Sequence, residues 1–554
     1  MTRDAVQSEP KADQLSSRMG RPSAPSQMHV WVRYLLVALC SVLYLLPFLR
    51  VLSWQGDEGT LLTGAVRVLE GQVPYRDFFE VMGPGTFYWL AAFLKIFGTT
   101  WAATRICMLV TATATTLLMF HLSRRLGAAK TVLPLILFIP ASYEFWTMNT
   151  HHTASTLFGL LSFTAFLRWM DTRNAAMLFL AGAGAGITTL FLQPKGVLLC
   201  LAFFVLVFLN CREKRMRAVL WLSGGYAVVL TSIVVLYALS GGLHDLLYAN
   251  VVWPLTNYSD INNVPYGQGF HDYWKMFSGS FALVGPPVAA KLIAAGFSLP
   301  FVAIAGLPVA LAALGFFGRR QFFGGLFLPY WLVGAALWLA EVHRKDLPHL
   351  VFGSPVLVIL AVHLCQRMSG RWVAPLLGLV TTCAAMLGMS NTLVGLLSSH
   401  AQYSRRGVVY SSLAEPDPTL SFTNQHVRAG EQLFVYPYSP QYYFFTATQN
   451  PTRYSILMYY MNTEGQFQDA VKSLERGRVR YVIWDQSFAR FAPHFFPKYH
   501  VPPPDQLIME PYLQSHYRRV SGKDGGVGVF ERNNDAEAGA SSAAEFHPSN
   551  PIKP

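Results

Sequence analysis

Long apolar stretches, separated by short polar segments, recur along most of the chain. The first begins at Val30 and ends near Leu52. The others lie at about 99–122, 131–147, 152–169, 174–193, 196–211, 218–240, 289–316, 322–340, 350–366 and 372–396. Because a helix needs about 20 mostly apolar residues to cross the hydrocarbon core of a bilayer, this pattern predicts a polytopic α-helical membrane protein. We expect about eleven transmembrane helices within residues 30–396.

The loop after the first stretch, residues 53–93, has a different pattern. DEGTLLTGAVRVLEGQ places leucine, alanine and valine on one face of a helix, and Gly71 ends it. PYRDFFEVMGPGTFYWLAAFLKIFG indicates a turn and then a second helix, whose aromatic residues are typical of a membrane interface. We therefore expect two interfacial helices between the first two spans.

Beyond the last apolar stretch the pattern becomes polar and mixed. In residues 397–532, EQLFVYPYS and RVRYVIWDQ are typical of strands, and EGQFQDAVKSLERGR between them is typical of a helix. This alternation predicts a small α/β domain. The two ends of the chain, residues 1–29 and 533–554, lack the apolar residues that a packed core needs, and we expect them to be disordered.

Basic residues fall in alternate loops. The loops after the second, fourth, sixth, eighth and tenth spans carry Arg124, Arg125, Lys130, Arg168, Arg173, Arg212, Lys214, Arg215, Arg217, Arg319, Arg320, Arg367 and Arg371. Loops rich in Lys and Arg stay in the cytoplasm, so the N-terminus is predicted to be cytoplasmic. The 53–93 loop and the C-terminal domain are then extracytoplasmic, in a multi-pass protein of the cell inner membrane.

The composition agrees with a membrane protein. The 554 residues are 52% hydrophobic and only 13% charged, which is too apolar for a soluble protein of this size. The net charge of +13 is explained by the basic loops, so no nucleic-acid partner is expected. Six cysteines are scattered without CxxC or Cys/His spacing, so neither a metal cluster nor a disulfide framework is predicted.

Three carboxylates stand in the first loop. Asp57 and Glu58 follow the first span, and Glu80 lies in the second segment. Acidic residues beside an apolar span are costly to place near lipid, so they usually face a polar cavity and mark a functional site. The other outer loops and adjoining span ends supply Arg105, His151, His152, Lys195, His343, Arg344, Asp346 and His349.

Carboxylates beside cationic groups suit the transfer of a sugar from a phosphate leaving group to a hydroxyl group. A carboxylate can take the proton of the acceptor as general base. Lys, Arg and His can stabilise the charge of the leaving phosphate. Because nucleotide sugars are not at hand outside the membrane, we expect a donor linked to a lipid phosphate.

Most of the candidate residues also have a structural alternative. Asp57 and Glu58 could cap the helix that follows and complement its dipole. Lys195 could extend from the end of a span to the interface. The other candidates could be span anchors, interfacial residues or partners in a loop salt bridge: Arg105, His151, His152, Arg344 and Asp346.

An uncleaved first span, then Asp-Glu, then an interfacial pair with the pattern E-x-x-x-P-G-x-x-Y-W resembles the GT-C glycosyltransferases. These include the protein O-mannosyltransferases and the aminoarabinose transferases that modify lipid A. The sequence looks most similar to the bacterial group related to rhizobial lipopolysaccharide-core glycosyltransferases. The likeness covers residues 30–396 in topology, with sharp motif similarity in 53–93 and weaker similarity in QPKG and HRKDLPHL.

The resemblance implies roles for the acidic residues. Asp57 stands where the family has its presumed catalytic base, and Glu58 is the second member of the pair. Glu80 matches a glutamate that precedes Lys-Pro-Pro in the aminoarabinose transferases. Here VMGPG replaces that motif, so the partner lysine is missing and Lys195 becomes the preferred phosphate-binding lysine. Whether Glu80 and a histidine bind a divalent metal ion is left open.

The predicted function is an inverting glycosyltransferase that moves a sugar from a polyprenyl-phosphate donor to a cell-envelope glycan, lipid or protein. Two other classes stay open: a membrane transporter, and a non-catalytic envelope assembly or sensor protein. A transporter would have charges and broken helices at mid-membrane, whereas the polar candidates here gather at one face. Loss of function in Asp57→Asn would favour the enzyme, and loss only on deletion of residues 398–554 would favour the sensor.

Overall fold

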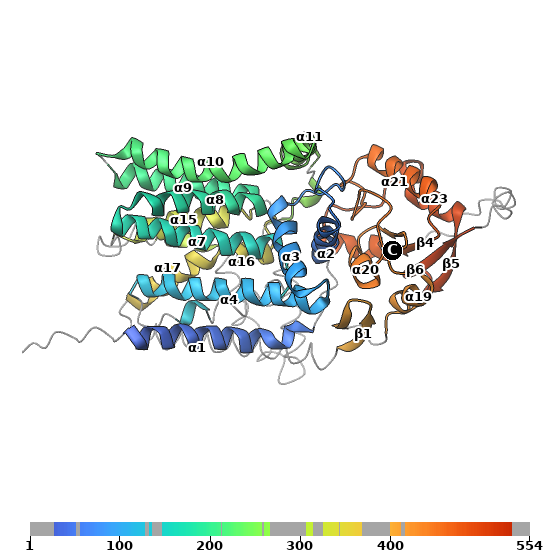
Figure 1. Ribbon diagram of the computed structural model, residues 1–554, viewed down its shortest axis with the longest axis horizontal. Helices are drawn as coiled ribbons and strands as arrows, with labels where there is room; N and C mark the ends of the chain where they lie inside the picture. The colour runs from blue at the N-terminus through green and yellow to red at the C-terminus, as the bar shows by residue number, and fades with distance from the viewer. Residues whose placement is uncertain are drawn as a thin grey trace, which may run out of the picture.

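A computed structural model describes residues 27–50, 56–127, 132–135, 147–211, 213–257, 260–265, 306–313, 325–342, 344–367, 399–411 and 416–533. Over these residues the chain forms a bundle of long helices and an α/β domain that sits on one end of the bundle (Figure 1). His343 and most of the two terminal segments that we expect to be disordered lie outside the described residues.

The long helices of the bundle run side by side (Figure 1). They are α1 (Gln27–Leu45), α4 (Trp101–Arg125), α7 (His151–Thr172), α8 (Ala175–Phe191), α9 (Gln193–Asn210), α10 (Arg215–Leu239), α15 (Phe327–Leu339) and α17 (Pro355–Arg367). Each falls on a predicted apolar stretch. Large apolar side chains fill the space between them, as where Phe166 of α7 stacks on Phe203 of α9 with ring centroids 4.4 Å apart.

Four of the described helices are long and apolar enough to cross a bilayer, namely Val30–Leu49, Trp101–Arg125, Gln193–Asn210 and Arg215–Leu239. Helices α8, α15 and α17 are apolar but shorter. Helix α7 has the length, but its two initial histidines and Arg168 make it more polar. The predicted spans 131–147, 289–316 and 372–396 lie wholly or largely outside the described residues, so the number of eleven stays a prediction.

The basic helix ends and the C-terminal domain lie at opposite ends of the bundle. Helix α4 starts against the C-terminal domain, where the backbone N–H of Trp101 donates to the carbonyl of Arg406 over 2.7 Å. The helix is roughly 37 Å long and ends at Arg125. The side chain of Arg125 pairs with Asp171, near the end of α7, at 2.6 Å. This arrangement agrees with the topology expected from the basic loops, and the orientation in the membrane remains an expectation.

Both helices predicted in the first loop are present. α2 (Gly56–Leu69) and α3 (Pro84–Phe97) lie between the bundle and the C-terminal domain (Figure 1). Helix α2 buries Leu61, Leu62 and Ala65. It ends just before Gly71, whose φ of 86° is in the left-handed region that glycine tolerates. Their predicted place at a membrane interface is not tested by the structure.

Short elements complete the same end of the bundle. α11 (Leu243–Leu247), a π-helical turn (Tyr248–Val252) and α12 (Trp253–Asn257) follow α10, and α16 (Leu347–Gly353) precedes α17. Trp253 lies against Phe79 of the first loop, with ring centroids 5.8 Å apart. The end of α10 is thereby joined to the α2–α3 loop.

The C-terminal domain contains the predicted strand–helix–strand unit. β3 (Leu433–Tyr436) and β4 (Tyr481–Asp485) pair in parallel, and α21 (Glu464–Gly477) lies between them in sequence. β6 (Val527–Arg532) pairs antiparallel with β4 and with β5 (Tyr517–Gly522), so the strand order is β3-β4-β6-β5. The other elements are β1 (His400–Ser404), β2 (Gly407–Ser411), α19 (Pro418–His426), α20 (Gln441–Thr446), α22 (Phe488–Phe495) and α23 (Met509–His516).

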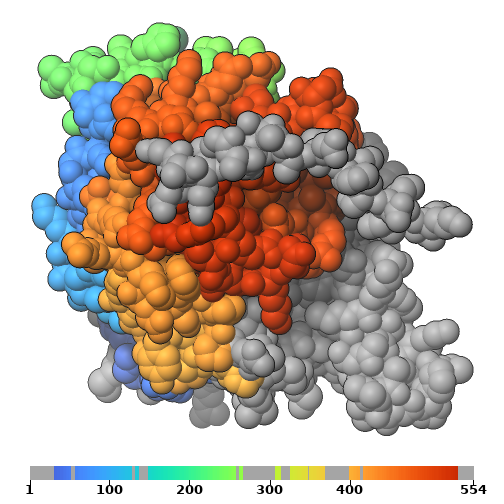
Figure 2. All heavy atoms as spheres, turned by 90° about the vertical axis from the view of Figure 1, so that its right-hand side faces the viewer, coloured from blue at the N-terminus to red at the C-terminus, as the bar shows by residue number. Residues whose placement is uncertain are grey.

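The C-terminal domain covers this end of the bundle, as the orange and red atoms in Figure 2 show. Its helix α20 packs against α2. The hydroxyl of Thr63 donates to the carbonyl of Pro440 at 3.0 Å. A Cβ atom at Gly59 would lie 2.5 Å from the backbone nitrogen of Gln441. The first loop and the C-terminal domain therefore form one packed unit.

We expect Gly59→Ala to weaken this contact. Because the new methyl group has no room, overpacking should destabilise the protein by about 1–3 kcal/mol, and the melting temperature in detergent should fall. Gly465→Ala is the control, since the nearest atom to its Cβ would be 4.0 Å away. An unchanged melting temperature for Gly59→Ala would show that α2 and α20 are not tightly packed.

Candidate active site

A cavity of about 280 Å³ lies where the first loop, the bundle and the C-terminal domain meet. Ligand pockets usually have volumes of about 300–1,000 Å³, so this cavity is close to the lower end of that range. Aromatic and aliphatic side chains form much of its wall. The polar residues on its wall that bear on chemistry are Asp57, Glu80, His151, His152, Asn262, Arg344, His349 and Tyr438.

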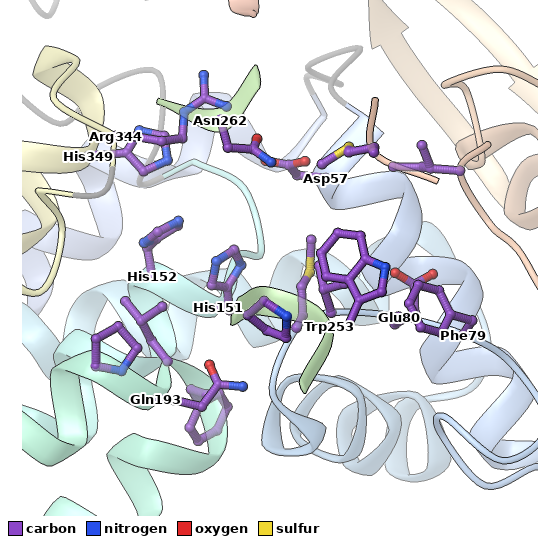
Figure 3. Close-up of a pocket in the computed structure, with 18 of the residues that line it drawn as sticks. Asp57, Phe79, Glu80, His151, His152, Gln193, Trp253, Asn262, Arg344 and His349 are labelled. Carbon is purple, nitrogen blue, oxygen red and sulfur yellow. The ribbon is translucent and has the colours of Figure 1, made fainter. Parts of the chain in front are cut away.

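The charged groups of the cavity are divided between two sides. Figure 3 shows the carboxylates of Asp57 and Glu80 on one side of the view. The imidazole rings and the guanidinium group lie on the other, and they belong to His151, His152, His349 and Arg344. A molecule in the cavity can therefore contact acidic groups and cationic or imidazole groups at the same time.

Asp57 stands in the first turn of α2 and is partly buried. The phenol of Tyr438, from the C-terminal domain, donates a hydrogen bond to its Oδ1 over 2.9 Å. An acidic residue in the first turn also complements the helix dipole. Asp57 can therefore stabilise the start of α2, which is the structural role expected from the sequence, and still face the cavity.

Glu80 lines the same cavity and is 7% exposed. Burial raises the pKa of its carboxyl group from 4.5 to about 8, against smaller opposite contributions from the Ser455 hydroxyl and the Arg67 guanidinium. Within the described part of the chain, its Oε1 accepts no hydrogen bond. A buried carboxyl group with a free oxygen and a pKa near neutrality is suited to bind or to exchange a proton with a polar ligand.

Arg67 of α2 holds the loop that carries Glu80. Its Nη1 and Nη2 donate to the carbonyl groups of Thr452 and Asp77, each at 3.1 Å. Its Nε donates to Gln72 at 2.6 Å. The turn between α2 and α3 is therefore tied both to α2 and to the C-terminal domain, which fixes the position of Glu80.

Asp346 organises the opposite side of the cavity. It caps α16 by accepting from the backbone N–H of His349 at 3.1 Å. Its carboxylate also contacts Nδ1 of His349, and it pairs with Nε of Arg344 at 3.2 Å. Burial by itself would raise the pKa of Asp346, but His349 and Arg344 hold that pKa below its ordinary value. Asp346 thus orients the two side chains that face the cavity.

Two histidines reach the cavity from the first turn of α7, which Thr150 caps. The ring of His152 lies against those of His151 and His349, with centroids 3.9 Å and 4.8 Å away. Nδ1 of His152 is 2.8 Å from Oε2 of Glu341. The orientation of this ring is therefore set by a carboxylate behind it.

Glu341 also pairs with Lys195, whose Nζ lies 2.5 Å from Oε1. Nζ of Lys195 donates to the hydroxyl of Thr156 at 3.0 Å. Both partners of the ion pair are 0% exposed, so Lys195 lies behind the cavity wall and not on it. Glu341 was not among the predicted site residues, although a carboxylate at the end of an apolar stretch is the same signal that marks Asp57.

Glu58 and Arg105 form a buried ion pair away from the cavity wall. Each is 1% exposed. Oε1 of Glu58 accepts from the backbone N–H of Asn149 at 2.9 Å, and Nη1 of Arg105 donates to the carbonyl of Thr147 at 2.9 Å. Their contacts hold the segment that leads into α7, so they support the histidines from a distance.

The structure thus brings six predicted residues to one cavity: Asp57, Glu80, His151, His152, Arg344 and His349. Among the lining residues that were not predicted, Asn262 and Tyr438 bear on the chemistry. Neither has a local sequence signal. Tyr438 meets Asp57 only because the fold joins positions 381 residues apart.

No group of three or more His, Cys, Asp or Glu side chains that could hold a metal ion occurs within the described ranges. In Figure 3, Glu80 lies on the side of the cavity opposite the histidines. The residues seen at Glu80 therefore do not fit a metal site, and no metal ion enters the chemistry proposed below.

Comparisons with known proteins give several matches. Residues 81–237 match the family model of the dolichyl-phosphate-mannose-protein mannosyltransferases. ArnT from Cupriavidus metallidurans, solved bound to undecaprenyl phosphate, has a TM-score of 0.54 and 13% identity, covering 92% of this chain and 98% of ArnT. Its apo form gives a TM-score of 0.44 with 14% identity over 91% and 98%. The search of curated protein sequences gave no match.

The arabinosyltransferase EmbB from Mycobacterium smegmatis gives a TM-score of 0.33 with 15% identity, over 68% of this chain and 43% of EmbB. Together with the family model, the match to ArnT bound to undecaprenyl phosphate confirms the resemblance to the GT-C membrane glycosyltransferases. It shows a shared fold of several apolar helices with a small C-terminal sheet domain. At 13% identity only the fold is shared, so the chemistry has to come from the side chains of this chain.

Proposed function

We propose that this chain is an inverting membrane glycosyltransferase that moves a sugar from a polyprenyl-phosphate donor to a hydroxyl group of a cell-envelope glycan, lipid or protein. The observation that supports this most directly is one cavity with Asp57 and Glu80 on one side and Arg344 and His349 on the other. The fold likeness to ArnT, solved with undecaprenyl phosphate, supports a lipid-linked donor.

In this proposal Asp57 is the general base. Its carboxylate takes the proton of the acceptor hydroxyl while the acceptor oxygen forms a bond to the anomeric carbon of the sugar. The bond between that carbon and the phosphate oxygen breaks, and its electron pair leaves with the polyprenyl phosphate. Because one displacement occurs from the face opposite the leaving group, the anomeric configuration inverts.

The leaving phosphate would lie on the cationic side. Arg344 offers a planar guanidinium group, which suits phosphate geometry. His349, which Asp346 orients, and the two histidines of α7 lie on the same side. Lys195 then has a different role from the one expected from sequence: through Glu341 it holds His152, and it does not contact the phosphate itself.

The sugar ring would lie between Glu80, on the carboxylate side, and Asn262, which Figure 3 shows between Arg344 and Asp57. Asn262 is 2% exposed, and its Nδ2 has no acceptor among the residues that the structure describes. Oε1 of Glu80 is likewise without a donor there. A buried polar group without a partner costs about 1–3 kcal/mol, and the hydroxyl groups of a sugar would remove that cost. The acceptor is not specified by these contacts, and we propose only that it brings a hydroxyl group to Asp57.

The proposed site is at one end of the bundle and not halfway along it, which favours an enzyme over a transporter. The predicted topology would place this end on the outer face of the cytoplasmic membrane. A sensor whose active part is the C-terminal domain alone is disfavoured, because the cavity is shared between that domain and the bundle.

The raised pKa of Glu80 predicts a pH-dependent stability. Between its ordinary value of 4.5 and about 8, the folded protein holds a proton on Glu80 that the unfolded chain releases. The free energy of unfolding should therefore decrease as pH rises through this range, by up to about 1.4 kcal/mol per pH unit. Glu80→Gln, which cannot ionise, should reduce this slope when melting temperatures are compared from pH 5 to 8. An identical slope in wild type and variant would mean that Glu80 ionises normally.

The stereochemistry of the product tests the proposed reaction. Purified protein is supplied with polyprenyl-phosphate sugars of known anomeric configuration and with membrane extract as the source of acceptor. NMR of the isolated product should show the opposite configuration. Retention of configuration would contradict a single displacement and would require a nucleophile on the protein.

A further inference from the structure

We propose that the C-terminal domain completes the active site by supplying Tyr438 as a positioning residue that orients the carboxylate of Asp57. This inference rests on the proposed function, because it takes Asp57 as the general base. It assigns to the C-terminal domain a role in the reaction, beyond covering the end of the bundle.

The contact between Tyr438 and the start of α2 is close and specific. The Tyr438 phenol donates to Oδ1 of Asp57 at 2.9 Å. The ring itself lies against the backbone of the preceding residue, since any Cβ atom at Gly56 would overlap with it. A glycine is therefore needed at position 56, directly before Asp57. The contact with Tyr438 explains this glycine, and the sequence alone does not reveal it.

The Tyr438 ring is held by aromatic neighbours from α22 and its end. Its centroid lies 5.5 Å from that of Phe488 and 6.0 Å from that of Phe496. The ring therefore has little freedom to turn, and its hydroxyl group stays directed at Asp57. Such a preorganised donor is what a positioning residue requires.

The same aromatic cluster also reaches the cationic side of the cavity. The guanidinium of Arg344 lies 5.2 Å from the Phe496 ring, and its Nη2 donates to the carbonyl of Phe495 at 2.7 Å. One segment of the C-terminal domain thus contacts the base through Tyr438 and the phosphate-binding group through Arg344. It fixes the separation between the two groups that must act on the same donor.

The hydrogen bond has a defined chemical consequence. Because Oδ1 of Asp57 is occupied, Oδ2 is the oxygen left to take a proton, and no described residue donates to it. Tyr438 therefore keeps the carboxylate of Asp57 in a fixed orientation, without touching the sugar or the phosphate.

Tyr438→Phe tests this inference, because it keeps the ring and removes only the hydroxyl group. We expect kcat to fall about 10-fold while KM for the donor and the melting temperature change little. Because only the orientation of the base changes, kcat and kcat/KM should fall by the same factor. A merely structural tyrosine would lower the melting temperature or raise KM, and it would not change kcat alone. Wild-type kcat in this variant would overturn the inference.

Tyr460→Phe is the matched control. Tyr460 is in the same domain, but its hydroxyl group is 2.6 Å from His500 and away from the cavity wall. It should keep wild-type kcat. In an Asp57→Asn background, Tyr438→Phe should cause no further loss, because the two residues act as a unit. If wild type transfers no sugar, the proposed function fails. If Asp57→Asn is fully active, Asp57 is not the base and the role of Tyr438 fails with it. If Asp57→Asn is inactive and Tyr438→Phe is unchanged, only the role of Tyr438 fails.

Discussion

Asp57→Asn is expected to lower kcat at least about 100-fold, which is the usual loss when a general base is removed. The amide keeps the size of the side chain and can still accept the hydrogen bond from Tyr438. It cannot take a proton from the acceptor. Donor binding should be nearly unchanged, since the phosphate is placed on the opposite side of the cavity. The measurement is the rate of polyprenyl phosphate release, together with donor affinity for both proteins.

Asp77→Asn is the matched control for this variant. Asp77 is a carboxylate of the same loop, but it pairs with Arg76 at 2.7 Å and does not line the cavity. Its loss should leave kcat within a few-fold of wild type. Equal kcat in Asp57→Asn and wild type would remove Asp57 from the reaction. A similar loss in both variants would mean that the loop is disturbed and that no base has been identified.

Glu341→Gln is expected to destabilise the protein by about 3–5 kcal/mol, the range seen when one partner of a buried ion pair is removed. Lys195 is 0% exposed and would lose its carboxylate partner, keeping among the described residues its hydrogen bond to the hydroxyl of Thr156. His152 would lose the carboxylate at 2.8 Å that orients it. Activity should therefore fall as well as the melting temperature.

The double variant Glu341→Gln, Lys195→Met separates these effects. With no charge left unpaired, its stability should be higher than the sum of the two single losses implies. Activity should stay low if His152 needs Glu341, because the double variant restores charge balance but not that carboxylate. Additive losses of stability would show that Lys195 and Glu341 do not interact as the distance of 2.5 Å indicates.

The sequence predicts well those parts of the fold that depend on local pattern. The apolar stretches correspond to helices such as α4 and α10 because bilayer thickness imposes a length and a composition that few other structures require. The strand–helix–strand unit of β3, α21 and β4 follows from periodicity and from turn residues. The packing of α20 on α2 was not predictable, because it depends on contacts between distant segments.

The candidate site was also only partly predictable from the sequence. Asp57 and Glu80 were found because isolated carboxylates beside apolar spans need a polar environment. Lys195 is also a charged residue at the end of an apolar span, but it pairs with Glu341 inside the protein. A charged residue in this position therefore does not reveal by itself whether it faces a cavity or forms a buried ion pair. Glu58 is a second example, since Arg105 neutralises it inside the protein. Only the fold shows which charged groups face the cavity and which face each other.

The most direct test follows the sugar itself. Purified wild-type protein is given a polyprenyl-phosphate donor labelled in the sugar, together with membrane extract as acceptor. We expect the label to appear on the acceptor at the same rate as an equal amount of free polyprenyl phosphate is released. No label should be transferred when the acceptor is left out, and none should be transferred by Asp57→Asn. If every donor tested stays intact, or if reconstituted protein moves labelled lipid across the bilayer without releasing polyprenyl phosphate, then the chain is not the glycosyltransferase proposed.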